Sequence, residues 1–398
     1  MVAASPDGHG LLDDLQDIPT VCRRSPMPLR HLNTEDMHLM KNSLHRPWLA
    51  SLIAGIALGA STTGMAASDR AFVPMGTADA VAIIDLEHQE VVSTVVDTIN
   101  THGSALTPDG RQLIVGSLSP HDAGSEIARP EGVTEDEHAS HHGDGGTAST
   151  KAASTGLLYV ADTATSRIIR TLEVPGPVHH VLVTRDGSHA VSTHPTGGGI
   201  SVVSLESGQV IASLATGPNP NYLVQHEEGG SILVSNAGNG TISEVDPQHW
   251  FVQRNIRVGG NPEHMVLSKD GKTLYVNDDA GGSVLAVDLT TGSVADDYEI
   301  GTAPHGIDLS PDGRRLYVTS QGDNRLVRIS LEDGARHAAE LAPAPYHLAV
   351  APTDGRVLVT SREEPRMWIL DPDSLEVLQA VELEGIGHQI SLSDSRSR

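Results

Sequence analysis

The segment "TAPHGIDLSPDGRRLYVTSQGDNRLVRISL", Thr302–Leu331, decides the fold because it is one copy of a recurring unit. A histidine precedes an apolar stretch, a Pro-Asp-Gly turn follows, and a second apolar stretch comes after it. In such a turn proline presets φ and glycine takes a positive φ, so the two stretches form a β-hairpin. The sequence predicts four strands in this copy, at residues 306–309, 315–319, 324–330 and about 337–341.

The unit returns at a nearly constant spacing. Successive copies, separated by 42, 42, 42, 41 and 42 residues, begin at His179, Asn221, Glu263, His305, Tyr346 and His388. An earlier copy begins at His102, 77 residues before His179, which is one period plus an insertion of about 35 residues. Four short strands at this period are typical of a β-propeller blade.

The two ends of the repeat complete each other. The last copy stops after one strand, "HQISLSD", whereas three unaccompanied strands come first, at residues 71–75, 80–86 and 91–96. Together they make a composite blade that closes the ring. The predicted fold is therefore all-β, a seven-bladed propeller of four-stranded blades over residues 70–394, closed by a blade shared between the N- and C-termini.

The repeat resembles the YVTN-repeat family of bacterial β-propellers, in the stretches "SPDGRRLYVTSQGDNRLVRIS" and "SKDGKTLYVNDDAGGSVLAVDLTTGSV". Fold relatives of that family include the cytochrome d1 domain, the nitrous oxide reductase propeller, lactonases and a periplasmic zinc metallochaperone. The resemblance covers about residues 70–394 and implies the fold, whereas function has to be argued from the site. Nitrous oxide reductase binds copper through histidines in a comparable place, but this chain has no cupredoxin-like partner domain.

Charge and cysteine content limit the kinds of partner. The chain has 26 Lys and Arg against 51 Asp and Glu, a formal net charge of −25, which excludes nucleic-acid binding and favours cations. The single cysteine, Cys22, lies near the N-terminus, so the repeat contains neither disulfides nor thiolate metal ligands.

Residues 40–67 are predicted to be a cleaved signal peptide. Lys41 and Arg46 form a basic start, residues 48–60 are apolar, and Ala66-Ala67 ends a small-residue cleavage site. A signal of this kind is read at an N-terminus, so Met40 is the expected true start and residues 1–39 an upstream extension. We expect a periplasmic protein with no membrane span in the mature chain; the alternative is an uncleaved anchor with a short acidic tail.

Histidine recurs where the innermost strand of each blade begins, except in the blade that starts at Asn221-Tyr222. Converging imidazoles suit zinc first and copper second, and a neighbouring carboxylate could join them. The candidate metal ligands at this channel mouth are His102, His179, His180, His264, His305, His347, His388 and Glu263. His264 and His347 come one position later than His102, His179, His305 and His388, so strand alternation predicts that not all of these histidines aim identically. Alternatively, such histidines only hydrogen-bond the backbone of an adjacent blade.

The insertion at about residues 119–154 is rich in histidine and acid and too poor in apolar residues to bury a core. It joins the second and third strands of its blade, on the face where the innermost strands begin. We expect a flexible arm that collects metal for the channel site, through His121, His138, His141 and His142. The alternative is a solvated acidic loop.

The predicted function is a non-catalytic metal-binding protein or metallochaperone that holds zinc or copper and serves a periplasmic metal-transport or metalloprotein partner. Three alternatives remain: a metal-free interaction scaffold, a lactonase-like enzyme, and a d1-haem-related propeller. No CxxCH haem-attachment motif is present, and no nucleophile motif stands out.

Overall fold

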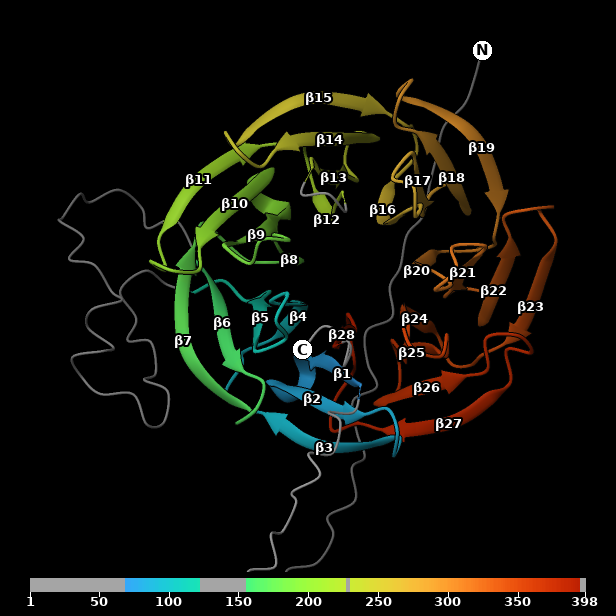
Figure 1. Ribbon diagram of the computed structural model, residues 1–398, viewed down its shortest axis with the longest axis horizontal. Helices are drawn as coiled ribbons and strands as arrows, with labels where there is room; N and C mark the ends of the chain where they lie inside the picture. Colours follow the sequence, from blue (N-terminus) through green and yellow to red (C-terminus); the bar gives the residue numbers. More distant parts are fainter. Residues whose placement is uncertain (1–68, 122–154, 227–229, 394–398) are drawn as a thin grey trace, which may run out of the picture. The chain divides into compact units, whose positions relative to one another are not determined.

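The computed structural model describes residues 69–121, 155–226 and 230–393. Their strands form seven antiparallel sheets of four strands each, arranged as blades around a ring, which confirms the predicted β-propeller (Figure 1). Two short 3-10 turns, η1 (Gly76–Ala78) and η2 (Pro195–Gly197), are the helical elements of this described part. None of its helices is long and apolar enough to span a membrane.

Six blades are continuous in sequence, and in each of them the chain runs from the innermost strand to the outermost. The first two are β4 (Thr101–Leu106), β5 (Gln112–Ser117), β6 (Gly156–Asp162), β7 (Arg167–Val174), and β8 (Val181–Val183), β9 (His189–His194), β10 (Gly199–Ser204), β11 (Val210–Ala215). The next two are β12 (Pro220–Gln225), β13 (Ile232–Asn236), β14 (Thr241–Asp246), β15 (Phe251–Arg257), and β16 (Pro262–Leu267), β17 (Thr273–Asp278), β18 (Ser283–Asp288), β19 (Ser293–Glu299). The last two are β20 (Pro304–Leu309), β21 (Arg315–Ser320), β22 (Arg325–Ser330), β23 (Arg336–Glu340), and β24 (Pro345–Val350), β25 (Val357–Ser361), β26 (Arg366–Leu370), β27 (Val377–Glu382).

The seventh blade combines both ends of the described chain. Its innermost strand is β28 (Ser391–Ser393), followed by β1 (Arg70–Met75), β2 (Ala80–Asp85) and β3 (Glu90–Val95). Strand β28 pairs antiparallel with β1, with Arg70 opposite Ser393 and Phe72 opposite Ser391. The predicted closure by a shared blade is therefore confirmed.

The core lies between the blades because each middle strand buries both of its faces. Val73 of β1 and Ile84 of β2 pack against Leu358 and Ile369 of the preceding blade. The alternate residues Phe72 and Ile83 pack with Val115 and Tyr159 of the following blade, as the two-residue period of a strand requires. Outermost strands such as β19 are largely exposed, which places the polar side chains on the rim.

Ending the chain after His388 is expected to destabilise the propeller strongly. The deletion removes β28 and exposes the surfaces that Ile390 and Leu392 cover. Since burial of one aliphatic side chain contributes about 1.5–3 kcal/mol, we expect a loss of about 3–5 kcal/mol. In thermal unfolding followed by circular dichroism this corresponds to a Tm lower by roughly 10 °C. A control that removes residues 394–398 alone should unfold like the full chain, and an equal loss in both would contradict closure by β28.

Candidate functional site

The innermost strands begin with a β-bulge that repeats around the ring. In β16, Pro262 lies opposite Asp278 and Met265 opposite Val276, so three steps on one strand match two on the other. The same shift occurs in β4, β12, β20 and β24. A bulge inserts one unpaired residue and interrupts strict alternation. We call the two residues inside it the first and second bulge positions.

The channel residues occupy these two positions. In those five strands the first position holds His102, Asn221, Glu263, His305 and Tyr346, in chain order. The second holds Gly103, Tyr222, His264, Gly306 and His347. By the repeat, the pairs His179-His180 and His388-Gln389 correspond to them in the other two blades.

Histidines from both positions nevertheless converge. The ring centroid of His264 lies 4.2 Å from that of His305 and 4.8 Å from that of His347. The His102 centroid lies 5.1 Å from that of His180 and 5.5 Å from that of His347. His264 and His347 do stand one position later in their strands than His102 and His305. The bulge nevertheless lets side chains at both positions reach one cluster.

Two triads in this cluster have the spacing of a metal site, and they share His347. One consists of His102, His180 and His347, the other of His264, His305 and His347, and the candidate ligand atoms within each lie within 4.8 Å of one another. Tetrahedral zinc, with Zn–N bonds of 2.0–2.1 Å, brings its ligand nitrogens to about 3.4 Å. Small side-chain rotations would thus complete either triad.

Hydrogen bonds orient two of the rings. His180 Nδ1 lies 3.0 Å from the Asn221 carbonyl oxygen, so Nδ1 carries the proton in the neutral ring and Nε2 presents its lone pair. That Nε2 lies 3.2 Å from Nε2 of His264. In the same way, His305 Nδ1 lies 3.3 Å from a carboxylate oxygen of Glu263, which leaves His305 Nε2 as the ligand atom. A carboxylate behind a histidine is a common support for a metal ligand.

Several imidazole nitrogens are buried with no hydrogen-bond partner in the described part of the chain. They are both nitrogens of His102, Nδ1 of His264 and His388, and Nε2 of His305 and His347. Each such group costs about 1–3 kcal/mol. His194, also buried, shows a structural histidine by contrast: its Nδ1 bonds the Gly176 and Pro177 carbonyls and its Nε2 bonds the Ser201 hydroxyl.

The seven histidines of the channel mouth, which we call the ring histidines, are neutral at pH 7. Burial, and then repulsion from neighbouring histidines, hold the pKa of His102, His180, His264 and His347 well below the ordinary value of 6.5. The same causes act on His305. Burial also lowers the pKa of His179, and it lowers that of His388 to about 4. Neutral imidazoles are the form that binds metal.

Two tyrosines and an arginine complete the site, although their roles were not evident from the sequence. Tyr222 packs edge-on against the rings of His180 and His264, where its blade lacks a histidine. Tyr346 stacks on His305 with centroids 3.9 Å apart, and the Arg362 guanidinium lies 5.3 Å from the Tyr346 ring centre. Tyr222 and Tyr346 occupy bulge positions, so the repeat register was the signal that could have found them.

The remaining predicted residues fall into four groups. His179 stacks on His102, and the ring centroid of His388 lies 4.3 Å from that of His102. Both histidines therefore contact the cluster without joining either triad. Glu263 contacts His305 through its carboxylate. His121 stands at the base of the predicted arm, where its backbone pairs with Thr155. His138, His141 and His142 lie outside the described residues, as do residues 1–67.

The base of the arm lies on the face predicted for it. The insertion joins β5 to β6, the second and third strands of their blade. Strand β5, which leads into the insertion, ends at Ser117. Ser117 pairs with Thr101, the residue before His102. The two sides of the insertion therefore leave the blade on the face where the ring histidines begin.

Comparisons with known proteins agree with the fold. The family model described as outer membrane protein assembly factor BamB matches residues 114–381. No curated protein matches the chain.

Solved structures with similar folds have different activities. The periplasmic gluconolactonase of Pseudomonas aeruginosa is 18% identical with a TM-score of 0.60, over 82% of this chain and 99% of that one. Hydrazine synthase of Kuenenia stuttgartiensis is 17% identical with a TM-score of 0.58, over 73% and 89%. A dihydro-heme d1 dehydrogenase is 12% identical with a TM-score of 0.56, over 79% and 63%. At these identities the likeness shows the propeller fold alone.

Proposed function

This chain belongs to the family of the outer membrane protein assembly factor BamB, and from that premise we propose that its propeller is a non-catalytic metal-binding protein or metallochaperone. It binds one transition-metal ion, zinc first and copper second, at the histidine-lined channel mouth. Within the propellers we assign the repeat to the YVTN type. Residues 40–67 act as a cleaved signal peptide, so that the mature protein works in the periplasm and passes metal to a transport or metalloprotein partner.

One observation supports the proposal most directly: buried histidines converge in two triads, and each member except His180 has an imidazole nitrogen without a hydrogen-bond partner among the described residues. Burial of such groups is unfavourable unless something binds them. The low pKa of these histidines keeps the lone pairs available, and Glu263 holds one ring in the ligating orientation. The set therefore has the chemistry of a metal site, and a bound ion would offset the cost of burying it.

The donor set favours zinc. Imidazole nitrogen with a carboxylate nearby is typical of zinc sites, and copper accepts the same nitrogens. Because the two triads share His347, two independent ions would compete for one ligand, and we assign a single ion. The arm residues His121, His138, His141 and His142 act as a weaker collecting site that loads it.

The alternative functions, an enzyme, a d1-haem protein or an interaction scaffold, have less support. The gluconolactonase and the dihydro-heme d1 dehydrogenase share the fold at below 20% identity, which transfers no activity. A carboxylate against an imidazole, as Glu263 lies against His305, is an arrangement found in general bases. The same contact also supports a histidine that binds a metal. An interaction scaffold would give no reason for unpartnered imidazoles in the channel.

Metal analysis tests the proposal. The mature chain, purified without chelators or a histidine tag, is expected to contain close to one zinc per protein by mass spectrometry. A variant with His102, His264 and His305 changed to alanine breaks both triads and should contain almost none. A His88→Ala/His249→Ala control removes two exposed histidines and should keep its metal. Wild-type protein that stays metal-free after loading at neutral pH would contradict the site and favour a scaffold.

A further inference from the structure

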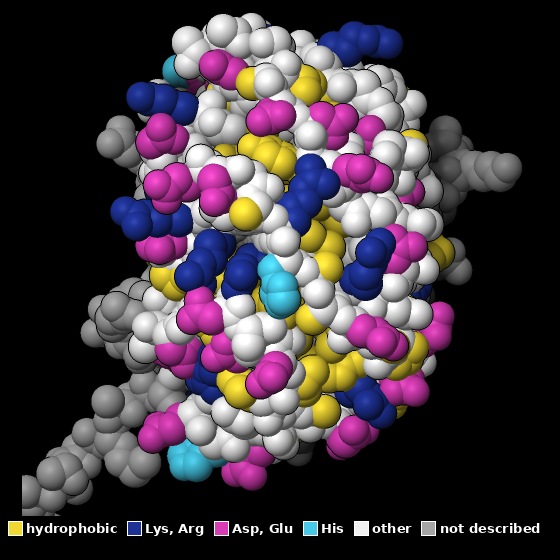
Figure 2. All heavy atoms as spheres, turned by 90° about the vertical axis from the view of Figure 1, so that its right-hand side faces the viewer, with side chains coloured by type: hydrophobic (Ala, Val, Ile, Leu, Met, Phe, Trp, Pro, Cys, Tyr) yellow, Lys and Arg dark blue, Asp and Glu magenta, His cyan; other side chains and the backbone are white. Residues whose placement is uncertain are grey.

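A group of arginines stands out on the rim of the blade β20–β23. Four guanidinium groups lie within a short stretch of an otherwise acidic chain, at Arg314, Arg315, Arg328 and Arg336. Together with Ser330 and His337 they line a pocket of about 380 Å³. On the side of the molecule that holds β22 and β23, dark blue cations gather around a histidine (Figure 2).

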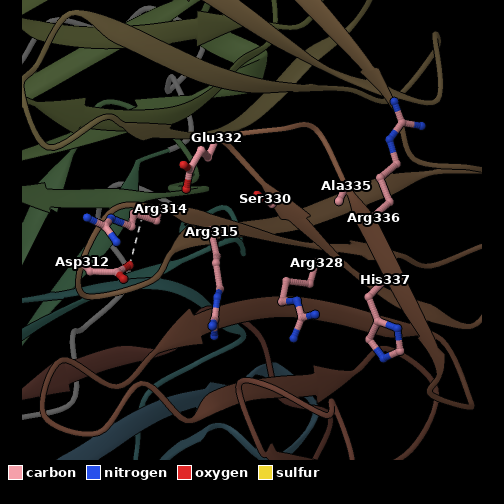
Figure 3. A pocket seen from close by; sticks show the side chains of 9 residues that line it. All are labelled: Asp312, Arg314, Arg315, Arg328, Ser330, Glu332, Ala335, Arg336 and His337. Carbon is pink, nitrogen blue, oxygen red and sulfur yellow. Dashed lines mark hydrogen bonds between the residues drawn. The ribbon is translucent and has the colours of Figure 1, made fainter.

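The side chains that line the pocket come from different elements. Arg315, Arg328 and His337 extend to the same side, whereas Arg314 and Arg336 stand toward opposite ends (Figure 3). The pocket therefore offers cationic donors at several separated points. It is lined by β21, β22, β23 and the turn before β21, apart from the histidines on the innermost strands.

Contacts with neighbouring blades fix two of the guanidiniums. Arg328 Nη1 donates to the backbone carbonyl of Asp373, in the blade β24–β27. On the other side, Arg336 Nη1 donates to the Glu299 carbonyl at 2.8 Å, at the end of β19. Among the described residues these bonds use one nitrogen of each fork, which leaves the Nε–Nη2 edge for a ligand. Donors held in this way lose little freedom when they bind.

The lining has an excess of positive charge. Four arginines face two carboxylates, Asp312 and Glu332. One oxygen of Asp312 is occupied by the Ser310 hydroxyl at 2.6 Å and by the Arg314 backbone N–H at 3.0 Å. Asp373, beside the pocket, already pairs with Arg315. The local charge is thus opposite to that of the whole chain.

We propose that this pocket binds a small polyanion, a molecule that carries two or more negative charges on carboxylate or phosphate groups. Planar guanidinium forks match the paired oxygens of both groups. The volume suits a small molecule, and donors at separated points exceed what one monoanionic group can engage. The pocket and the metal site are independent, so either can fail without the other.

The test is calorimetric titration of the full metal-free protein with tricarballylate, a tricarboxylate, and with inorganic phosphate, in low salt at pH 7. Acetate is the monoanion control. Two variants remove the donors: Arg328→Gln/Arg336→Gln, and Arg314→Glu, which reverses an exposed charge and keeps the backbone bond to Asp312. The matched control, Arg111→Gln/Arg257→Gln, removes two charges from other blades. Thermal unfolding of each variant checks the fold.

Wild-type protein and the Arg111/Arg257 control are expected to bind tricarballylate or phosphate at least tenfold more tightly than acetate. Both pocket variants should weaken that binding at least tenfold. Stronger binding of tricarballylate identifies a polycarboxylate ligand, and stronger binding of phosphate identifies a phosphorylated one. The proposal is overturned if neither probe binds, or if the control double variant weakens binding as much as the pocket variants, since general attraction would then explain it.

Discussion

Replacing His347 by alanine is expected to weaken zinc binding by about 100-fold or more, the largest effect of any single change at the site. His347 belongs to both triads, so its loss leaves no complete set of three histidines among the described residues. Loss of an outer support typically costs 10- to 100-fold in metal affinity, and loss of a direct ligand costs at least as much. Competition with a chromophoric chelator at pH 7.5 measures the change.

His102→Ala is the matched comparison. It breaks one triad and leaves His264, His305 and His347 together, so the ion can use the second set and affinity should fall less than about tenfold. Equal losses in the two variants would show that a single triad binds the ion and that His347 is not a shared ligand. Both variants remain informative if the apo proteins unfold at similar temperatures.

Acidification from pH 6.5 toward pH 4.5 is expected to destabilise the metal-free propeller steeply. The seven ring histidines have a lowered pKa in the folded state, mainly through burial, whereas the unfolded chain takes up protons at about 6.5. The contribution of these histidines to the free energy of unfolding is therefore fully present above about pH 6.5. It is lost as the pH drops toward their pKa values in the folded state, and the pKa of His388 is about 4. Each such group costs up to about 1.4 kcal/mol per pH unit in this window.

Carboxylates do not obscure this effect. Hydrogen bonds from Thr184 and Ser188 lower the pKa of Asp186 to about 2, so it contributes at lower pH. Burial raises the pKa of Asp308 to about 6, and it also raises the pKa of Glu263 and of Asp279. These carboxyls act in the opposite direction but are three groups against seven. Urea unfolding at a series of pH values measures the slope. The variant lacking His102, His264 and His305 should show a shallower slope, and an unchanged slope would contradict the prediction. In the zinc-loaded protein, release should follow the same fall in pH as ligands protonate.

The sequence was sufficient for the architecture because a propeller is a one-dimensional repeat. Each unit cannot bury its own apolar faces, so the 42-residue spacing fixes which strands form a blade. The unmatched ends at residues 71–96 and after His388 fixed the ring closure, since one strand and three strands complete one blade. Such patterns depend on local strand pairing and on the repeat period, and both can be read from the sequence.

The sequence also indicated the histidines of the candidate site, but neither their arrangement nor the tyrosines and the arginine beside them. Position before the innermost strand indicated the seven histidines and Glu263. Strict alternation predicted that not all of these histidines would aim identically, because His264 and His347 come one position later than His102 and His305. The repeated bulge nevertheless brings both positions to one cluster. A bulge depends on pairing with the next strand and leaves no clear mark in composition.

Only the tertiary structure decided which histidines form triads, why their nitrogens are unpartnered, and where the arginines of the rim gather. Those properties depend on distances between blades that are far apart in the sequence, such as those of His102 and His347. They also depend on burial, which lowers the pKa of each imidazole and which no single segment determines. The repeat in the sequence thus determined the ring and its closure, and packing across the ring determined the chemistry at its centre.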